Sequence, residues 1–294
     1  MTIFGSGYRA IEYAPTAPLA RWLVLARSEF RLQLRGKRSV LLYLFCHLQN
    51  WMSLIVMLIW AGFWQLGGDR PMPMGGRAFA DPSNIDFYLA SVTSPAANLA
   101  TTTLVTLGVV RSIARDRQSG ALEIQWTRGV SPLGYFLGKW IGGVFVIGSV
   151  AVAAPLALWI VAALNSSEDG FFGRAIEILP RFLAANGAFT VITAGLATAL
   201  SSAPRTANVA SILWAVGVAG GAGLARVAVR LSGHDDAFYA LSPVDSLRTI
   251  TRAIGGLEPQ LGPPLGHAVI ALAVVAVLLA LLLRRRLRLD GALA

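Results

Sequence analysis

Few side chains in this sequence have the type and spacing for chemistry, and three of them lie within an uncharged run. His47, Gln49 and Asn50 stand in its first third, with His47 and Asn50 three residues apart and therefore on one helical face. Polar groups in hydrocarbon are costly without partners, so these residues are candidates for a translocation path or a subunit contact. The alternative is that they hydrogen-bond to a neighbouring helix of the same chain.

Other candidate sites are incomplete. Met72 and Met74 could offer thioethers to Cu(I), but no His or Cys nearby completes a site. His234-Asp235-Asp236 are adjacent and cannot easily converge on one ion. A phosphate-binding loop, G-x-x-x-x-G-K-[ST], is absent, because Gly134 to Lys139 has the wrong spacing and lacks the hydroxyl. We therefore predict a chain that is not an enzyme and that binds no metal or cofactor itself.

Composition indicates a membrane protein. Of the 294 residues, 55% are hydrophobic and only 14% are charged, against about 25% charged in an average soluble domain. Uncharged runs long enough to cross a bilayer occur six times. They are Ser39 to Leu66, Phe87 to Val110, Trp140 to Asn165, Phe182 to Pro204, Thr206 to Ala225 and Gly266 to Leu283. The predicted fold is all-α, with six transmembrane helices.

The distribution of charge predicts the orientation. The two termini and the even-numbered connections hold 17 of the 25 Lys and Arg residues, whereas the other three loops hold 8. The positive-inside rule then places both termini in the cytoplasm. We attribute the net charge of +10 to topology and to contact with membrane lipids, not to nucleic acid.

The N-terminal region predicts an amphipathic helix lying in the cytoplasmic interface. Leu19, Trp22, Leu23, Ala26, Phe30 and Leu34 share one face, and Arg21, Arg27, Ser28, Arg31 and Arg35 share the other. The alternative is a soluble amphipathic helix packed on another domain. The predicted organisation is a cytoplasmic N-terminus with this helix (1–38), a six-span domain (39–284) and a basic cytoplasmic tail (285–294).

The segment Arg111 to Lys139 is the longest charged, turn-rich interruption between the spans. The second span continues as a charged helix, is cut at Ser119-Gly120, and is followed by a short amphipathic piece, Ala121 to Thr127. Gly129-Val-Ser-Pro132 then breaks the chain before the third span. The pattern predicts a helix, a short cross-piece and a second helix at the cytoplasmic face, a geometry suited to a groove on a soluble partner.

This segment resembles the permease subunits of type-2 ABC exporters, the six-helix ABC-2 permeases. The residues that match are Arg115-Asp-Arg117, Gly120, Leu122-Glu123, Ser131-Pro132 and Gly138-Lys139. Departures are Asp116, where the family more often has Glu, and Ile124-Gln125-Trp126, where aliphatic residues are usual. Leu241 to Arg248 also looks like a segment of the nitrous-oxide-reductase maturation permeases, with Ser242 in place of Asn.

The resemblance implies a coupling helix between spans 2 and 3, seated on a separate cytoplasmic ATPase subunit that binds ATP and Mg. The implied interface residues are Arg115, Asp116, Arg117, Gly120, Leu122, Glu123, Trp126, Arg128 and Lys139. It further implies a second permease copy or homologue, the inner membrane of a prokaryotic cell, and export of an unidentified substrate.

Two other functional classes remain as alternatives. A secondary transporter should carry intramembrane carboxylates for ion coupling, and Asp and Glu are absent from all six predicted spans. A membrane scaffold or assembly factor is compatible with the basic anchors, but gives no reason for the Gly-Leu-Glu cross-piece.

Overall fold

The computed structural model describes residues 18–35, 37–65, 84–122, 125, 130–165, 171–233, 235–258 and 262–292. Within these ranges the chain forms helices and no strand. Five of the helical stretches are long and apolar enough to cross a membrane, or six if one bent pair is counted as a single span. The prediction of an all-helical fold is therefore confirmed for the described residues, and five or six of its helical stretches could span a membrane.

The first span is bent instead of continuous. Helix α1 (Pro18–Gln33) is followed by α2 (Lys37–Cys46) and α3 (Leu48–Gln65). A bend of 46° at His47 separates the apolar parts of α2 and α3. His47 lies at this bend, and Asn50 lies in the first turn of α3.

The second span is broken near one end. Ser94 and Pro95 separate α5 (Ile85–Thr93) from α6 (Pro95–Leu107), because Pro95 cannot donate to the preceding turn and the Ser94 hydroxyl caps the new helix at Ala97 N. The chain continues through η1 (Val109–Arg111) into α7 (Ser112–Gln118).

The third span contains a π-helical stretch. It runs through α9 (Pro132–Gly148), η2 (Ser149–Ala153) and α10 (Ala154–Asn165). Pro155 lacks the backbone N–H that would donate a helical hydrogen bond to the carbonyl of Ala151. The Ser91 hydroxyl donates to that carbonyl instead (3.5 Å). The helix is thus locally widened just before Pro155.

The remaining helices complete the bundle. They are α11 (Phe171–Ser201), α12 (Ala207–Leu231), the short η3 (Asp236–Leu241), α13 (Pro243–Ile254) and α14 (Leu265–Ala292). Helices η3 and α13 lie in the connection between α12 and α14. Ser242 caps α13 at Asp245 N (3.2 Å), which is what an Asn at this position would also do.

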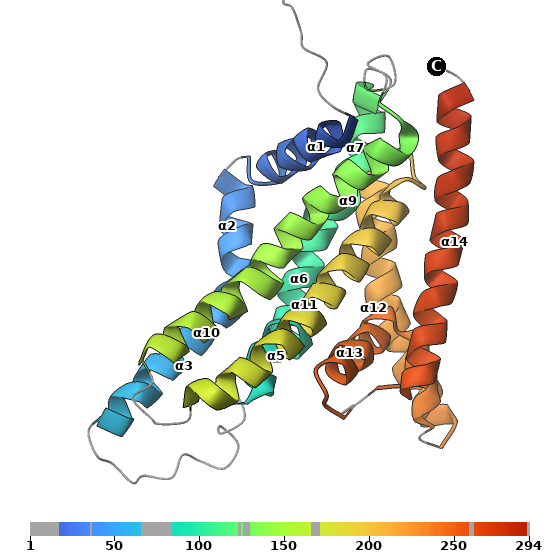
Figure 1. The fold of residues 1–294 in the computed structure, drawn as a ribbon. Helices are drawn as coiled ribbons and strands as arrows, with labels where there is room; N and C mark the ends of the chain where they lie inside the picture. The colour runs from blue at the N-terminus through green and yellow to red at the C-terminus, as the bar shows by residue number, and fades with distance from the viewer. Residues whose placement is uncertain are drawn as a thin grey trace, which may run out of the picture.

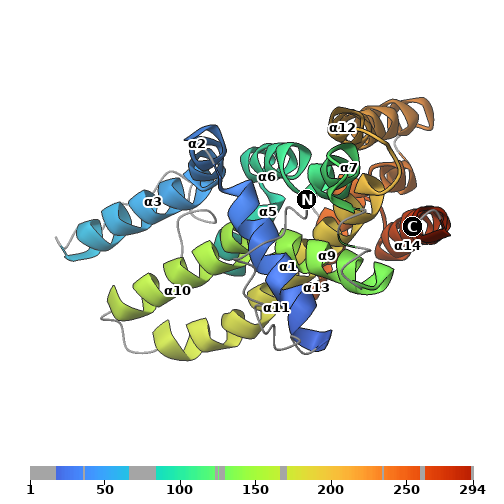
Figure 2. The same cartoon turned by 90° about the horizontal axis from the view of Figure 1, so that it is seen from above.

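Helices α9 and α11 lie at the centre of the bundle, and α12 and α14 lie on the side away from α2 and α3 (Figures 1 and 2). Half of the apolar stretch of α11 is buried inside the chain, against 11% for α12 and 17% for α14. The outer faces of α12 and α14 are therefore available to lipid or to another subunit.

Helix α1 lies across α9 at the end of the bundle where α14 also finishes (Figure 1). We call this end the α1 end. The turn between α11 and α12 adjoins α7 at the same end. Helix α13 lies toward the opposite end, between α11, α12 and α14 (Figure 1).

Candidate functional site

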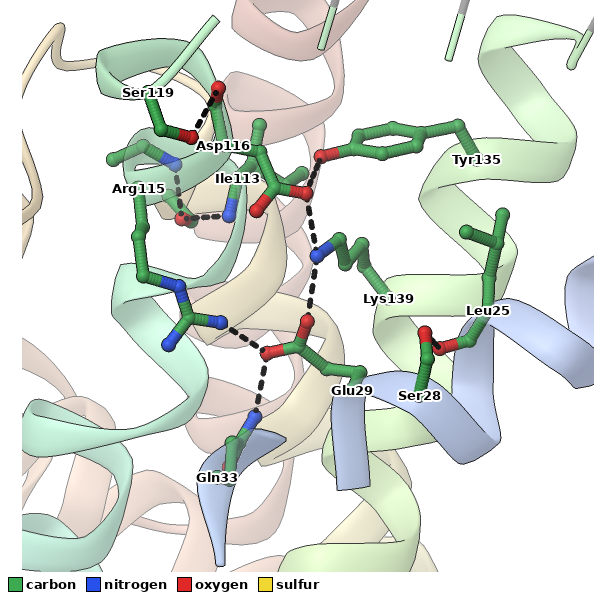
Figure 3. Close-up of polar contacts among 12 residues, drawn as sticks. Leu25, Ser28, Glu29, Gln33, Ile113, Arg115, Asp116, Ser119, Tyr135 and Lys139 are labelled. Atoms are coloured by element: carbon green, nitrogen blue, oxygen red, sulfur yellow. Dashed lines mark hydrogen bonds and ion pairs between the residues drawn. The ribbon is translucent and has the colours of Figure 1, made fainter. Parts of the chain in front are cut away.

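A buried network of charges joins α1, α7 and α9 at the α1 end (Figure 3). At its centre, the Lys139 ammonium on α9 lies 2.5 Å from Glu29 Oε2 and 2.6 Å from Asp116 Oδ2. The other carboxylate oxygen of Glu29 accepts from Arg115 Nη2 (3.0 Å) and Gln33 Nε2 (3.1 Å). The Tyr135 hydroxyl donates to Asp116 Oδ2 at 2.8 Å. Two carboxylates and two cations therefore balance inside the fold.

Burial makes this network more than a surface ion pair. The side chain of Glu29 is 1% exposed and that of Lys139 is 6% exposed. Burial alone would raise the pKa of Glu29, yet the Lys139 ammonium and the Arg115 guanidinium outweigh it and hold that pKa below its ordinary value of 4.5. Glu29 is accordingly ionised at neutral pH, and removing one charge would strand the others in a low-dielectric site.

Glycines on α9 let α1 approach closely enough for these contacts. A Cβ at Gly138 would lie 2.7 Å from Leu25 Cβ, and one at Gly142 would lie 2.8 Å from Glu29 Cβ. The two glycines share one face of α9 because they are four residues apart, and this face meets α1. The small-xxx-small spacing of Gly138 and Gly142 therefore brings the α1 backbone against α9.

The three consecutive charged residues at the end of α7 each bind a different element. Arg115 binds Glu29 of α1, Asp116 binds Lys139 of α9, and Arg117 donates to the carbonyls of Ser202 (2.8 Å) and Pro204 (2.9 Å). These carbonyls belong to the turn between α11 and α12. The end of the second span is thus fixed to three parts of the bundle at once.

Contacts within the backbone reinforce this attachment. Ser201 Oγ accepts from the backbone N–H groups of Ile113 (2.9 Å) and Ala114 (3.1 Å), which lie in the first turn of α7 and have no partner within that helix. Gln118 Oε1 accepts from Ala207 N at the start of α12 (3.3 Å). A displacement of α7 must therefore disturb α12 as well as α1 and α9.

Apart from Gly120, the residues predicted to contact a partner fall into three groups. Arg115, Asp116 and Arg117 are partly exposed and make the contacts above. Leu122 is 4% exposed and packs with Ile113 and Tyr135, while Lys139 is occupied by its two carboxylates. Leu122 and Lys139 consequently support the segment from within instead of forming its surface. Glu123, Trp126 and Arg128 lie outside the described residues.

The local backbone conformation explains why position 120 is a glycine. Its φ of +72° lies in the left-handed region, which favours glycine, and no atom lies within 4 Å of the place where a Cβ would be. The backbone N–H of Gly120 bonds to Arg117 O (3.3 Å), so this residue turns the chain out of α7. The predicted interruption at Ser119-Gly120 is confirmed.

The polar residues of the first span have local partners. Asn50 is buried and donates from Nδ2 to the carbonyl of Val150 (3.1 Å), within the π-helical stretch. His47 is half-buried and packs edge-on against the Tyr43 ring, at 4.7 Å between centroids. Gln49 is half-buried. For Asn50 the alternative of a hydrogen bond to a neighbouring helix of the same chain is therefore confirmed.

Glu29 is the residue that the sequence reasoning missed. The predicted apolar face of α1 included Ala26, which is fully buried against α9 and cannot lie in lipid. The strip that faces α9 includes Leu25 against Gly138 and Glu29 against Gly142, and their spacing of four residues marks one helical face. Glu29 is the one acidic residue of α1, and this was the signal available.

Among the described residues, no group of three or more His, Cys, Asp or Glu side chains could hold a metal ion. His234 lies outside these residues, as do Met72 and Met74. Comparison with protein-family models and with curated proteins finds no match to this chain.

Proposed function

We propose that this chain is the permease subunit of an ABC-2 type transporter, an exporter whose ATP hydrolysis takes place on a separate cytoplasmic ATPase subunit. The observation that carries the proposal is the attachment of Arg115, Asp116 and Arg117 to three different elements. A segment held in this way can transmit a push from a partner to α1, α9 and α12 together. An ordinary loop has no need of such attachment.

In this mechanism the ATPase partner contacts the segment that follows Gly120. Binding of ATP and Mg closes the partner, and the closure moves the segment and the end of α7. The buried ion pairs keep α1 and α9 in register with α7, so the movement reaches the bundle as a rigid-body rotation. A second permease, identical or homologous, would complete the pathway.

The proposal places the α1 end at the cytoplasmic face of a prokaryotic inner membrane. Arg27 and Arg31 support this placement, because they lie on the exposed side of α1, and Arg35 is exposed just after this helix. Such a row of arginines at a membrane surface would bind lipid phosphates. The basic run that begins at Arg284 would act in the same way.

The first test is purification of the tagged full-length chain from its native membrane, followed by identification of a cytoplasmic ATPase that purifies with it. We expect the two proteins to purify together. Glu123→Lys should reduce the recovered ATPase and abolish ATP-dependent transport, because it reverses the charge of the cross-piece. The matched control is Asp236→Lys, an exposed residue of η3 toward the opposite end.

Two outcomes would contradict the proposal. One is that no ATPase purifies with a folded chain, which would favour the scaffold or assembly factor. The other is that Glu123→Lys leaves both association and transport at the level of Asp236→Lys. In that case the segment would not be the coupling element.

A further inference from the structure

The first three spans each depart from a regular α-helix part of the way along. The first span bends by 46° at His47, between α2 and α3. The second breaks at Ser94-Pro95, between α5 and α6, and the third contains the π-helical stretch η2 between α9 and α10. Helices α2, α6 and α9 lie toward the α1 end, whereas α3, α5 and α10 lie toward the opposite end (Figure 1). The three irregularities therefore divide these spans along one layer, which we call the break layer.

The backbone of η2 explains one contact within the break layer. The N–H of Ala154 donates to the carbonyl of Ser149, five residues back, and Pro155 has no N–H. The carbonyl of Val150 accepts from Asn50 Nδ2 of α3 instead (3.1 Å). Since a buried carbonyl without a donor is costly, the widened helix depends on a side chain from another span.

Three consecutive residues of η2 each accept a hydrogen bond from a different helix. The donors and acceptors are Tyr43 of α2 to Ser149 Oγ (2.5 Å), Asn50 of α3 to the Val150 carbonyl, and Ser91 of α5 to the Ala151 carbonyl (3.5 Å). Tyr43 and Asn50 lie on either side of the bend at His47, and Ser91 lies three residues before the break at Ser94. The irregularities of all three spans are thus joined by hydrogen bonds.

The apolar packing differs on the two sides of the break layer. Toward the α1 end, α2, α6 and α9 bury one cluster, which contains Cys46, Leu104 and Val146. Toward the opposite end, α3, α5 and α10 bury a second cluster together with the first half of α11. Its members include Met57, Phe87, Leu158 and Phe182. Each set of helices therefore packs as a unit of its own.

Helix α11 crosses the break layer without interruption and has a glycine there. Asn186 of α11 donates to Ser91 Oγ and to the carbonyl of Tyr88, both at 3.3 Å, which places this turn beside α5. The next residue is Gly187, and no atom lies within 4 Å of the place where its Cβ would be. Packing therefore does not require a glycine, and glycine weakens a helix relative to alanine. Gly187 allows α11 to bend at this layer.

We propose that the break layer is a hinge, about which α3, α5, α10 and the first half of α11 move as one body relative to α2, α6 and α9. The hydrogen bonds to η2 hold the arrangement described above. The bend, the break and the π-helical stretch absorb the movement, because helices deform most readily where their regular hydrogen bonding is interrupted. The hinge does not depend on the proposed transport function.

The test measures distances between two spin labels by pulsed electron paramagnetic resonance. The sample is the full-length protein in nanodiscs of phosphatidylethanolamine and phosphatidylglycerol, in a Cys46→Ala background. Leu133→Cys on α9 and Leu164→Cys on α10 place labels on opposite sides of the break layer, at exposed positions. Leu41→Cys on α2 with Leu133→Cys is the matched pair on one side. We expect two distances for the first pair and one for the matched pair.

Asn50→Leu keeps the size of the side chain and removes the donor to Val150. We expect it to raise the population of the second distance about fivefold, the effect of losing one hydrogen bond. Tyr43→Phe deletes only a hydroxyl, so it should act in the same direction and also serves if Asn50→Leu does not fold. The control is Thr103→Val, which removes a hydrogen bond within α6 alone and should change neither pair.

Gly187→Ala tests the hinge in the opposite direction. It stiffens α11 without a clash, so it should lower the population of the second distance. Gly217→Ala in α12 is its control, because a Cβ there also meets no atom within 4 Å.

A second distance that appears only in Asn50→Leu or Tyr43→Phe would still support the hinge, with the hydrogen bonds holding it closed. A single distance for the pair across the break layer, in the wild type and in both variants, would overturn the proposal. Equal broadening of the matched pair on one side would also overturn it, because the whole bundle would then be loosened instead of bending at this layer.

Discussion

The carboxylate of Glu29 binds cations that stand 86 and 110 residues further along the chain. Arg115 and Lys139 come from two different spans, and Asp116 supplies the second negative charge beside Lys139. Removing one member of a buried ion pair is far more costly than removing a surface charge, because the remaining charge stays desolvated. The network should therefore determine how firmly α1 is held.

We predict that Glu29→Gln lowers the free energy of unfolding of the purified protein by about 3 kcal/mol. The amide keeps the size of the side chain but leaves Arg115 without its carboxylate. Thermal unfolding in detergent measures the effect. Glu177→Gln, at an exposed position of α11, is the control and should change little. Equal effects of the two substitutions would show that the network does not stabilise the fold.

Because of the Glu29 carboxylate, we predict that the stability of the fold depends on pH. The pKa of Glu29 is lower in the folded protein than its ordinary value of 4.5, so the unfolded chain binds a proton first as the pH falls. The stability that Glu29 supplies is then complete above about 4.5 and is lost below it, as the pH falls through the folded pKa.

Unfolding temperatures of the wild type and of Glu29→Gln should therefore converge as the pH is lowered from 7 through this range. A difference that stays constant down to the acid limit of the fold would contradict the pKa shift. Lys139, Arg115 and Asp116 are present in both proteins, so the two proteins differ only in the carboxylate at position 29.

At the scale of elements, the contact between α1 and α9 depends on two glycines. We predict that Gly142→Val separates the helices and costs about 1–3 kcal/mol, because the new side chain would overlap Glu29 Cβ and the carbonyl of Ala26. Gly217→Val is the control, since no atom lies within 4 Å of a Cβ at that position in α12.

Limited digestion with trypsin measures this effect directly. Arg27 and Arg31 lie on the exposed side of α1, and cleavage there should be faster when α1 detaches from α9. We expect faster cleavage in Gly142→Val and the wild-type rate in Gly217→Val. Unchanged cleavage in both would mean that the close approach of α1 is not needed to hold it.

Much of the helical arrangement could be predicted from the sequence, because apolar length and the positions of charged residues determine where spans occur. The break at Ser94-Pro95 was missed, since both residues are uncharged and the apolar run continues through them. The bend at His47 has no proline or glycine to mark it. Such local features depend on contacts with other helices, which a sequence pattern does not reveal.

The candidate site was predicted only in part. The turn at Gly120 follows from local backbone preferences and is confirmed, whereas α9 begins at Pro132, eight residues before the predicted start of the third span at Trp140. Lys139 was placed at a partner surface because the resemblance to ABC-2 permeases implied it. Its burial follows from a long-range pairing with Glu29 and Asp116. Gly217 and Gly221 have a small-xxx-small spacing, yet Gly221 packs against Leu241 and Pro243 of the same chain.

At the scale of the whole molecule, the two ends of the bundle differ in charge, and this difference predicts how the protein lies in the membrane. Arg205 is exposed before α12, and Asp236 is exposed shortly after it. The 25 residues of α12 span about 37 Å, enough to cross the hydrocarbon core. The two positions should therefore lie on opposite sides of the membrane, with Arg205 in the cytoplasm.

Single cysteines at these two positions test the orientation. In a Cys46→Ala background, Asp236→Cys should react with a membrane-impermeant maleimide in intact spheroplasts, whereas Arg205→Cys should react only after permeabilisation. Cys46 is 1% exposed, so its removal eliminates residual labelling without altering the surface. The reverse pattern would invert the topology and place the segment after Gly120 outside the cell, where no ATPase could reach it. Labelling of both cysteines in intact spheroplasts would show instead that α12 does not cross the membrane.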